Sequence, residues 1–153
     1  MPMNRDFVGR TAPSSRPFEV TRGDIRRFAL AIGDRNPIYL DPEAAQAAGY
    51  PDVIAPPTFL ISASTGEGAG GLIGDPDSGV VYALVVHGEE RFDFHRPVRA
   101  GDVLDSLTRI ASIRDAGKNE LMTLVTEVTS NDEPVATVTN TIVSRGTAAE
   151  VPA

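Results

Sequence analysis

The stretch PPTFLISAS, residues 56–64, decides the class of fold that we expect. Two prolines interrupt the chain, and the residues from Phe59 to Ser64 that follow them have no polar face. A short helix without a polar face is usually buried on all sides. The stretch therefore predicts a central helix that the rest of the protein encloses. The next segment, Gly66 to Gly79, is rich in Gly, Asp and Pro, and predicts a flexible loop with the role of a lid.

From residue 80 onward the chain is rich in Val, Ile, Thr and Phe, which favour pleated, half-buried strands. Short breaks that contain Gly, Asp, Asn and Pro divide this part into segments. Consecutive strands with such short connections form an antiparallel meander. The expected strands are 81–95, 103–113, 121–129 and 135–144.

Upstream of the central helix the sequence predicts one short strand, over 17–20, and two helices. Thr21 is the expected N-cap of the first helix, and Asp24 has the position of a capping-box acid. This helix carries an apolar stripe and ends at Gly33, and the second helix spans 41–49. Together these elements predict an α+β domain, in which an antiparallel sheet wraps around a central buried helix.

Length and composition exclude several classes of function. The 153 residues fit one domain, with an irregular lead-in over 1–14 and a frayed tail over 146–153. A net charge of −7 argues against nonspecific nucleic-acid binding, and the lack of cysteine excludes disulfides, thiolate metal sites and a cysteine nucleophile. Neither a membrane helix, a secretory signal, a metal-ligand cluster nor a dinucleotide fingerprint is evident. We expect a cytoplasmic protein that holds no metal or cofactor and that binds neither membranes nor nucleic acid.

The segment 31–42, AIGDRNPIYLDP, is the best candidate for chemistry. It places a carboxylate, Asp34, and a phenol, Tyr39, on either side of an Asn36-Pro37 turn just after a helix end. Such a turn can hold both side chains at the mouth of one site. The alternative is that Asp34 caps local N–H groups and Tyr39 packs in the core.

Two further groups of side chains each allow two interpretations. His87 and His95 share one expected strand and, by alternation, one face of it. They are either half-exposed strand residues, or His87 is a substitute base for the site of Asp34. Arg91, Arg96 and Arg99 form either a basic rim for the phosphates of coenzyme A or a carrier protein, or ordinary ion pairs with neighbouring carboxylates.

The segment around Asp34 resembles the hydratase signature of the MaoC-like dehydratases, a branch of the hot-dog fold. The resemblance extends through 52–59, where the buried hot-dog helix should begin, and through 92–102, so that it covers nearly the whole chain. More narrowly, the chain is similar to small actinobacterial proteins that resemble the non-catalytic subunit of heterodimeric (3R)-hydroxyacyl-ACP dehydratases. The signature is matched at Gly33, Asp34, Asn36, Pro37, Ile38 and Asp41.

The resemblance implies a single hot-dog domain with an acyl-thioester site at a subunit interface. It assigns the catalytic carboxylate to Asp34, puts Tyr39 at the position of the family's catalytic His, and replaces the family's His-Gly pair by Pro56-Pro57. A phenol is a poor base at neutral pH, and proline has no N–H to stabilise an enolate oxygen. The substrate-binding residues that the resemblance implies are Asn36, Pro57, Thr58 and Phe59.

Three hypotheses follow from the resemblance. In the first, the chain is a tunnel-forming subunit of a (3R)-hydroxyacyl-thioester dehydratase or enoyl-thioester hydratase in fatty-acid metabolism, and a partner chain with the intact Asp and His performs the chemistry. In the second, it is a self-sufficient homodimeric (R)-specific enoyl-CoA hydratase that uses Asp34 with Tyr39 or His87. In the third, it binds acyl thioesters without turning them over. The expected ligand is acyl-CoA or acyl-ACP in each case.

Overall fold

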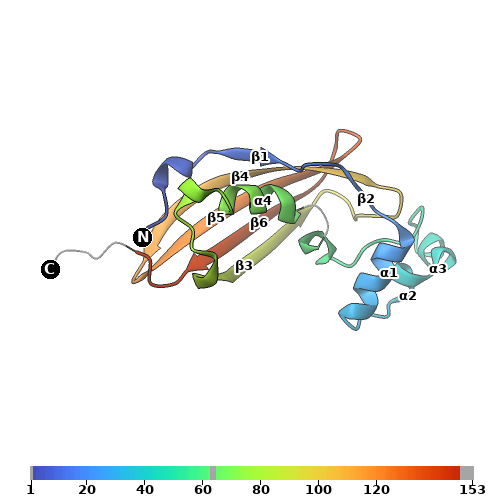
Figure 1. Ribbon diagram of the computed structural model, residues 1–153. Helices are drawn as coiled ribbons and strands as arrows, with labels where there is room; N and C mark the ends of the chain where they lie inside the picture. Colours follow the sequence, from blue (N-terminus) through green and yellow to red (C-terminus); the bar gives the residue numbers. More distant parts are fainter. Residues whose placement is uncertain (1, 63–64, 149–153) are drawn as a thin grey trace.

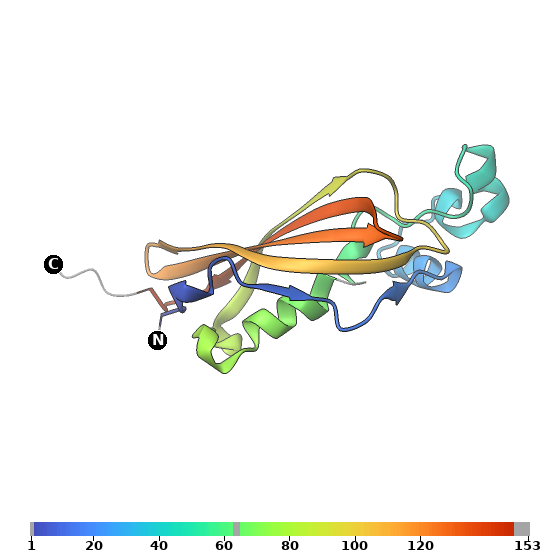
Figure 2. The same ribbon diagram turned by 90° about the horizontal axis from the view of Figure 1, so that it is seen from above.

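A computed structural model of the protein describes residues 2–62 and 65–148. Six antiparallel strands form one sheet in the order β1-β4-β5-β6-β3, with β2 paired to β4 beside β1 (Figures 1 and 2). The four long strands are antiparallel as predicted, but the meander is confirmed only for β4, β5 and β6, because β3 pairs with β6 at the far edge and not with β4. A 3₁₀ turn over Tyr82–Leu84 replaces the start of the first predicted strand. The strands are β1 (Thr11–Pro13), β2 (Phe18–Glu19), β3 (Val85–Phe94), β4 (Val103–Ala116), β5 (Asn119–Ser130) and β6 (Glu133–Ser144).

The helix that lies along the sheet is α4 (Thr65–Ile73), and it comes from the glycine-rich segment (Figures 1 and 2). The predicted helix over Phe59 to Ser64 is therefore wrong, because Phe59–Ile61 forms only a 3₁₀ turn and residues 63–64 lie outside the described part. The predicted loop over Gly66 to Gly79 is wrong as well. Glycine disfavours helices by about 1 kcal/mol relative to alanine, but close packing overrides this local preference here.

Gly68 shows why the helix needs small residues. A Cβ at this position would meet the carbonyl oxygen of Ala12 at 2.8 Å and Oγ1 of Thr108 at 2.9 Å. The backbone of α4 therefore lies directly on β1 and β4, at a distance that alanine does not allow.

Replacing Gly68 with alanine is expected to lower the free energy of unfolding by about 1–3 kcal/mol, because the added methyl group overpacks the contact between α4 and β1. Gly71→Ala is the matched control in the same helix, since a Cβ there meets nothing within 4 Å. This control should raise stability by up to about 1 kcal/mol. Urea unfolding of both variants tests the packing, and equal effects would contradict it.

Three short helices lie beyond one end of the sheet: α1 (Arg22–Ala31), α2 (Pro37–Leu40) and α3 (Pro42–Ala47) (Figure 1). The predicted capping box of α1 is confirmed, with Oγ1 of Thr21 accepting from the N–H of Asp24 at 3.1 Å. Gly33, at φ 77°, follows the end of α1 as predicted. The helix α2 was not predicted, because its first residue, Pro37, was interpreted as the end of a turn.

The predicted irregular lead-in is wrong for two segments. It contains β1 and a 3₁₀ turn over Arg5–Phe7. Phe7 is fully buried, and the guanidinium of Arg10 lies over its ring. The backbone N–H of Met3 donates to both carboxylate oxygens of the buried Glu120, at 3.1 and 2.9 Å. These contacts fasten the N-terminal segment to β5.

Two hydrophobic clusters occupy the two ends of the molecule. One surrounds Phe59 and Leu60 near the short helices, and the other joins Met3, Phe7 and Leu72 to β4, β5 and β6. At the chain end the N–H groups of Gly146 and Ala148 are hydrogen-bonded, and residues 149–153 of the predicted frayed tail lie outside the described part. Within the described residues, no helix is both long and apolar enough to cross a membrane.

Candidate functional site

The segment between α1 and α2 holds Asp34 in a tight local network. The N–H of Asp34 donates to the carbonyl oxygen of Ala29 at 2.9 Å, and its Oδ1 accepts from the N–H of Asn36 at 3.1 Å. Oδ1 of Asn36 in turn accepts from the N–H of Ile38 at 3.2 Å, which makes Asn36 the N-cap of α2. The carboxylate of Asp34 is half-buried. Asn36 thus has a structural part in positioning the next residues.

Tyr39 lies in α2 and is 8% exposed. Burial raises the pKa of its phenol, and the charge of the nearby Asp34 and the phenol of Tyr50 raise it further. A phenol with a raised pKa stays protonated at neutral pH, so that Tyr39 is a hydrogen-bond donor there and not a base. The charge of Asp34 thus acts on Tyr39, but Asp34 does not line the cavity that Tyr39 lines. Asp34 caps the N–H of Asn36 and Tyr39 packs in the core, as in the alternative interpretation that the sequence left open.

Tyr39 opens onto a cavity of about 330 Å³ between α2 and the end of β3. Of the predicted substrate-binding residues, Pro57 lines this cavity, whereas Phe59 packs against the rings of Phe18 and Phe28 in the core. Thr58 is exposed at the start of the 3₁₀ turn. The residues that line the cavity are Tyr39, Ile54, Ala55, Pro57, Phe94, His95, Arg96, Pro97 and Val98.

An ion pair forms part of the wall of this cavity. Arg96 donates through its two terminal nitrogens to the carboxylate of Asp102, at 2.9 and 2.8 Å. The N–H of Arg99 also donates to Asp102, which is 4% exposed. Burial opposes the ionisation of Asp102, but these hydrogen bonds outweigh it and hold the pKa of its carboxyl below the ordinary value.

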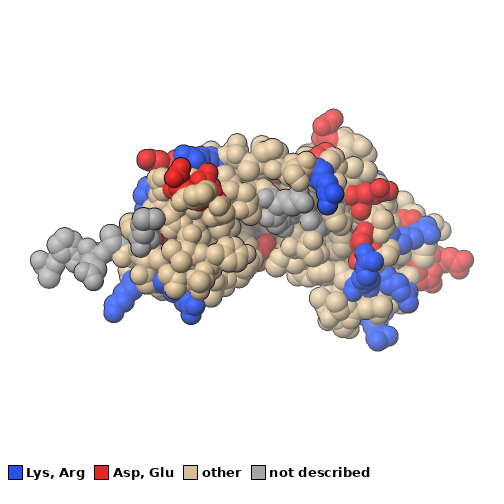
Figure 3. Space-filling view, in the orientation of Figure 1, with Lys and Arg blue, Asp and Glu red and all other residues tan. Residues whose placement is uncertain are grey.

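The arginines of the predicted basic rim form ion pairs instead. Arg91 donates to Asp93 at 3.1 and 2.8 Å, and Arg96 is paired to Asp102. This arrangement supports the interpretation that these arginines form ordinary ion pairs with neighbouring carboxylates. Basic side chains also gather over the end of the molecule that holds α1 (Figure 3), where Arg22 pairs with Asp52 at 2.8 Å.

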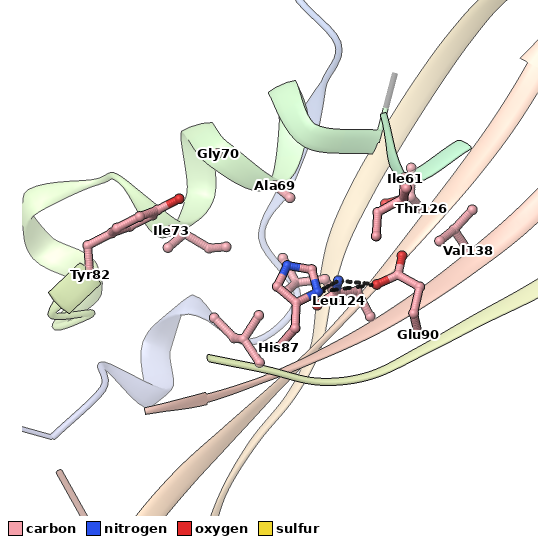
Figure 4. A pocket seen from close by; sticks show the side chains of 12 residues that line it. Ile61, Ala69, Gly70, Ile73, Tyr82, His87, Glu90, Leu124, Thr126 and Val138 are labelled. Atoms are coloured by element: carbon pink, nitrogen blue, oxygen red, sulfur yellow. Dashed lines mark hydrogen bonds and ion pairs between the residues drawn. The ribbon is translucent and has the colours of Figure 1, made fainter. Parts of the chain in front are cut away.

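A second cavity, of about 240 Å³, lies between α4 and the sheet (Figure 4). Most of its lining is apolar, but His87, Glu90 and Asn140 form one polar side. Nδ2 of Asn140 lies 3.3 Å from Nδ1 of His87 and donates to Oε2 of Glu90. The lining residues are Ile61, Ala69, Gly70, Ile73, Tyr82, His87, Glu90, Leu124, Thr126, Val138, Asn140 and Ile142.

The predicted shared face of His87 and His95 is wrong. A bulge between His87 and Glu89 shifts the register of β3 against β6 by one residue. His87 therefore shares its face with Glu90, and the two histidines line different cavities. Neither Asp34 nor Tyr39 lines the cavity of His87. Gly88, an isolated glycine within a strand pattern, is the sequence feature that could have predicted this bulge.

Sequence reasoning missed Glu90 and Asn140 as residues of a site. They belong to β3 and β6, which are far apart in the sequence, and they meet because Glu90 is directly opposite Asn140 in the register of the sheet. Such a pairing becomes visible only when the strands are aligned.

The antiparallel sheet wraps against one helix, with an acidic turn beyond the end of the sheet and a cavity beneath the helix. This arrangement defines a protein of the hot-dog dehydratase class. The chain belongs to the family described as "FAS1-like, dehydratase domain region", which matches residues 6–138. It is 52% identical to a UPF0336 protein of Parafrankia sp. over 97% of this chain and 98% of that protein. A UPF0336 protein of Saccharopolyspora erythraea is 46% identical, over 97% of this chain and 95% of that protein.

Solved structures agree with this family. The chain is similar to the C-terminally truncated HadBC (3R-hydroxyacyl-ACP dehydratase) complex from Mycobacterium tuberculosis, with 28% identity and a TM-score of 0.82 over 90% of this chain and 97% of that one. It is also similar to the ChsH1–ChsH2 complex from the same organism, with 25% identity and a TM-score of 0.69 over 94% of this chain and 88% of that one. The MaoC-like, hot-dog identity that the sequence predicts is confirmed.

Proposed function

We propose that the chain is a binding subunit of a (3R)-hydroxyacyl-thioester dehydratase or enoyl-thioester hydratase, and that a partner chain with the intact Asp and His performs the chemistry. One observation carries the proposal: the two positions that supply the base and the oxyanion donor in the family hold other residues in this cavity. The base is replaced by Tyr39, whose pKa is raised, and the N–H of an oxyanion donor is absent at Pro57.

The enolate of a thioester is stabilised most by an N–H donor that is already aimed at the developing oxygen. Pro57 cannot provide this donor, and the N–H of Phe59 is already bonded to the carbonyl oxygen of Pro56 at 2.9 Å. The cavities themselves are intact and mostly apolar, as acyl chains require. The chain thus keeps cavities for an acyl chain but lacks groups of the reaction centre. This combination supports binding of acyl thioesters without turnover by the chain alone.

The unpaired edge of the sheet at β3 supports the proposal that a second subunit binds there. Strand β3 pairs with β6 on one side, and among the described residues no strand covers its other side. Exposed apolar side chains accompany this edge, namely Val81, Tyr82, Val86 and Phe94. A long, exposed and partly apolar edge strand is a template for another chain. The HadBC and ChsH1–ChsH2 structures, to which this chain is similar, are complexes of two different chains.

The proposal is tested by mixing the purified chain with a MaoC-like relative that carries the intact Asp and His. Light scattering measures the mass of the species, and calorimetry measures octanoyl-CoA binding before and after mixing. We expect a mixed dimer that binds octanoyl-CoA. Val86→Lys at the edge of β3 should weaken the dimer at least about tenfold, since charge on an edge strand blocks pairing.

Ile32→Lys provides the matched control, because Ile32 is 50% exposed at the end of α1 and far from this edge in sequence and fold. Its dimer should be as stable as that of the unaltered chain. A chain that forms no dimer, or that binds no acyl thioester alone or mixed, is incompatible with the proposal. Binding without turnover in any mixture would favour a non-enzymatic binding module. A cytoplasmic location stays a prediction from the sequence.

A further inference from the structure

Polar side chains cross the sheet face beneath α4, between the two hydrophobic clusters. Thr108 on β4 is directly opposite Thr126 on β5, and Glu90 on β3 is directly opposite Asn140 on β6. Thr126 and Asn140 line the cavity under α4 together with Glu90 (Figure 4). On either side of this polar band the face is apolar, with Val138 belonging to one cluster and the residues around Ile142 to the other.

The two halves of the band differ in how well their hydrogen bonds are satisfied. Oγ1 of Thr108 and Oγ1 of Thr126 bond to each other at 2.9 Å, and so this half has local partners. In the other half, Asn140 donates through Nδ2 to Glu90, but its buried Oδ1 has no partner among the described residues. A buried acceptor without a partner costs about 1–3 kcal/mol.

Glu90 adds to this cost. Its side chain is 16% exposed, and burial raises the pKa of its carboxyl, although the hydrogen bond from Asn140 and the charge of His87 oppose the rise. Nδ1 of His87 lies 3.7 Å from Oε2 of Glu90. An apolar pair at these two positions would fill the same wall without this penalty.

The β-bulge at Gly88, which brings His87 next to Glu90 and Asn140, requires a glycine. A Cβ at Gly88 would meet Cγ2 of Val143 at 2.9 Å and the carbonyl oxygen of Thr141 at 3.1 Å, so that the strand needs glycine there. The register shift at this glycine turns His87 onto the face of Glu90. In Figure 4 the side chains of His87 and Glu90 point toward one another below Ala69 and Ile73 of α4.

We propose that His87, Glu90 and Asn140 bind a hydroxyl group on the ligand that occupies this cavity. A hydroxyl donates one hydrogen bond and accepts others, and it therefore pairs with an amide oxygen, a carboxyl and an imidazole without adding charge. The inference rests on the proposed function and deepens it. Because Asp34 and Tyr39 do not line this cavity, the hydroxyl lies along the acyl chain, away from the thioester end. The cavity thus selects an acyl chain that is hydroxylated within its apolar part.

Calorimetry on the purified chain tests this selectivity with four probes: dodecanoyl-CoA and its 6-, 9- and 12-hydroxy derivatives. We expect at least one hydroxylated probe to bind about tenfold more tightly than dodecanoyl-CoA, as a hydrogen bond to an otherwise unpaired buried group implies. In Asn140→Leu this preference should disappear, and dodecanoyl-CoA should bind at least as tightly as before.

Thermal unfolding separates this role from a structural one. The double substitution Glu90→Met with Asn140→Leu should not lower the melting temperature, because replacing both partners of the hydrogen bond by apolar side chains of similar shape leaves no unpaired group in this pair. Glu90→Gln keeps the shape of the carboxyl and should also weaken the preference, which provides a second variant if Asn140→Leu does not fold. Asp93→Asn is the control on the same strand, since Asp93 alternates with Phe92 and Phe94 and does not line the cavity.

Three results overturn the inference. The first is equal binding of all four probes. The second is a hydroxyl preference that survives in both Asn140→Leu and Glu90→Gln. The third is binding of none of the probes by the chain, either alone or mixed with the MaoC-like relative that carries the intact Asp and His, which also removes the proposed function. Tight binding of dodecanoyl-CoA without any hydroxyl preference removes this inference alone and leaves the proposed function in place.

Discussion

Replacing Asp102 with alanine is expected to lower the free energy of unfolding by about 3–5 kcal/mol, the cost of leaving one member of a buried ion pair without its partner. Asp102 is 4% exposed and the Arg96 side chain 21%. Nε of Arg96 is already buried without a hydrogen-bond partner among the described residues, and so the guanidinium is compensated by Asp102 and by the carbonyl oxygen of Pro97. The loss is a large part of the 5–15 kcal/mol that stabilises most domains.

The same variant should change how stability depends on pH. The folded-state pKa of Asp102 lies below its ordinary value, so that its stabilising contribution is present above the unfolded pKa of about 3.9 and is lost as the pH falls through the folded pKa. The difference between wild type and Asp102→Ala should therefore be constant near neutral pH and shrink below about pH 4.

Urea unfolding at several pH values measures both effects. Asp93→Ala is the matched control, because Asp93 and Arg91 form an ion pair at the surface, with side chains 49% and 69% exposed. Surface ion pairs contribute little to stability, and we expect little change in this control. Equal losses for the two variants would show that burial does not govern the Arg96–Asp102 pair.

The second large effect is a gain of activity. The double substitution Tyr39→His with Pro57→Gly is expected to raise the hydration of crotonyl-CoA at least about 100-fold over background, which is the rate expected for the unaltered chain. A positioned base contributes about 10²–10⁴ to such reactions, and an oxyanion donor about 10²–10³. Both substitutions act on the same cavity, next to the half-buried Asp34.

Absorbance of the enoyl thioester measures this rate. Each single substitution should give less than the pair, since both groups act in one transition state. Adding Asp34→Asn to the double variant should remove the gain, whereas His87→Gln should not affect it, because His87 lines the other cavity. A correctly folded double variant without any gain would mean that more than these two groups is missing from the reaction centre.

The fold was predictable where local chemistry and packing agree. The capping box at Thr21 and Asp24 and the four long strands were predicted correctly, because their patterns are local. The helix α4 was misplaced, because its glycines disfavour a helix by propensity and are selected by contact with β1 and β4 instead. That contact joins residues distant in sequence and has no local pattern.

The candidate site divides in the same way. Asp34 and Tyr39 are close in sequence, and the turn between them was enough to predict that they lie near each other, although it left open whether they share a site. The cluster of His87, Glu90 and Asn140 depends on a one-residue register shift at Gly88 and on the pairing of β3 with β6. A strand pattern without a register cannot reveal which polar residues meet beneath a helix.

The hydration of crotonyl-CoA by the purified chain is the most direct test of the central claim, that this subunit binds acyl thioesters but lacks its own reaction centre. The assay compares the chain alone, Asp34→Asn, and the chain mixed with a MaoC-like relative that carries the intact Asp and His. We predict no turnover above background by the folded chain alone, and more turnover by the mixture than by the relative alone. Turnover by the unaltered chain that disappears in Asp34→Asn would contradict the claim and identify a self-sufficient hydratase.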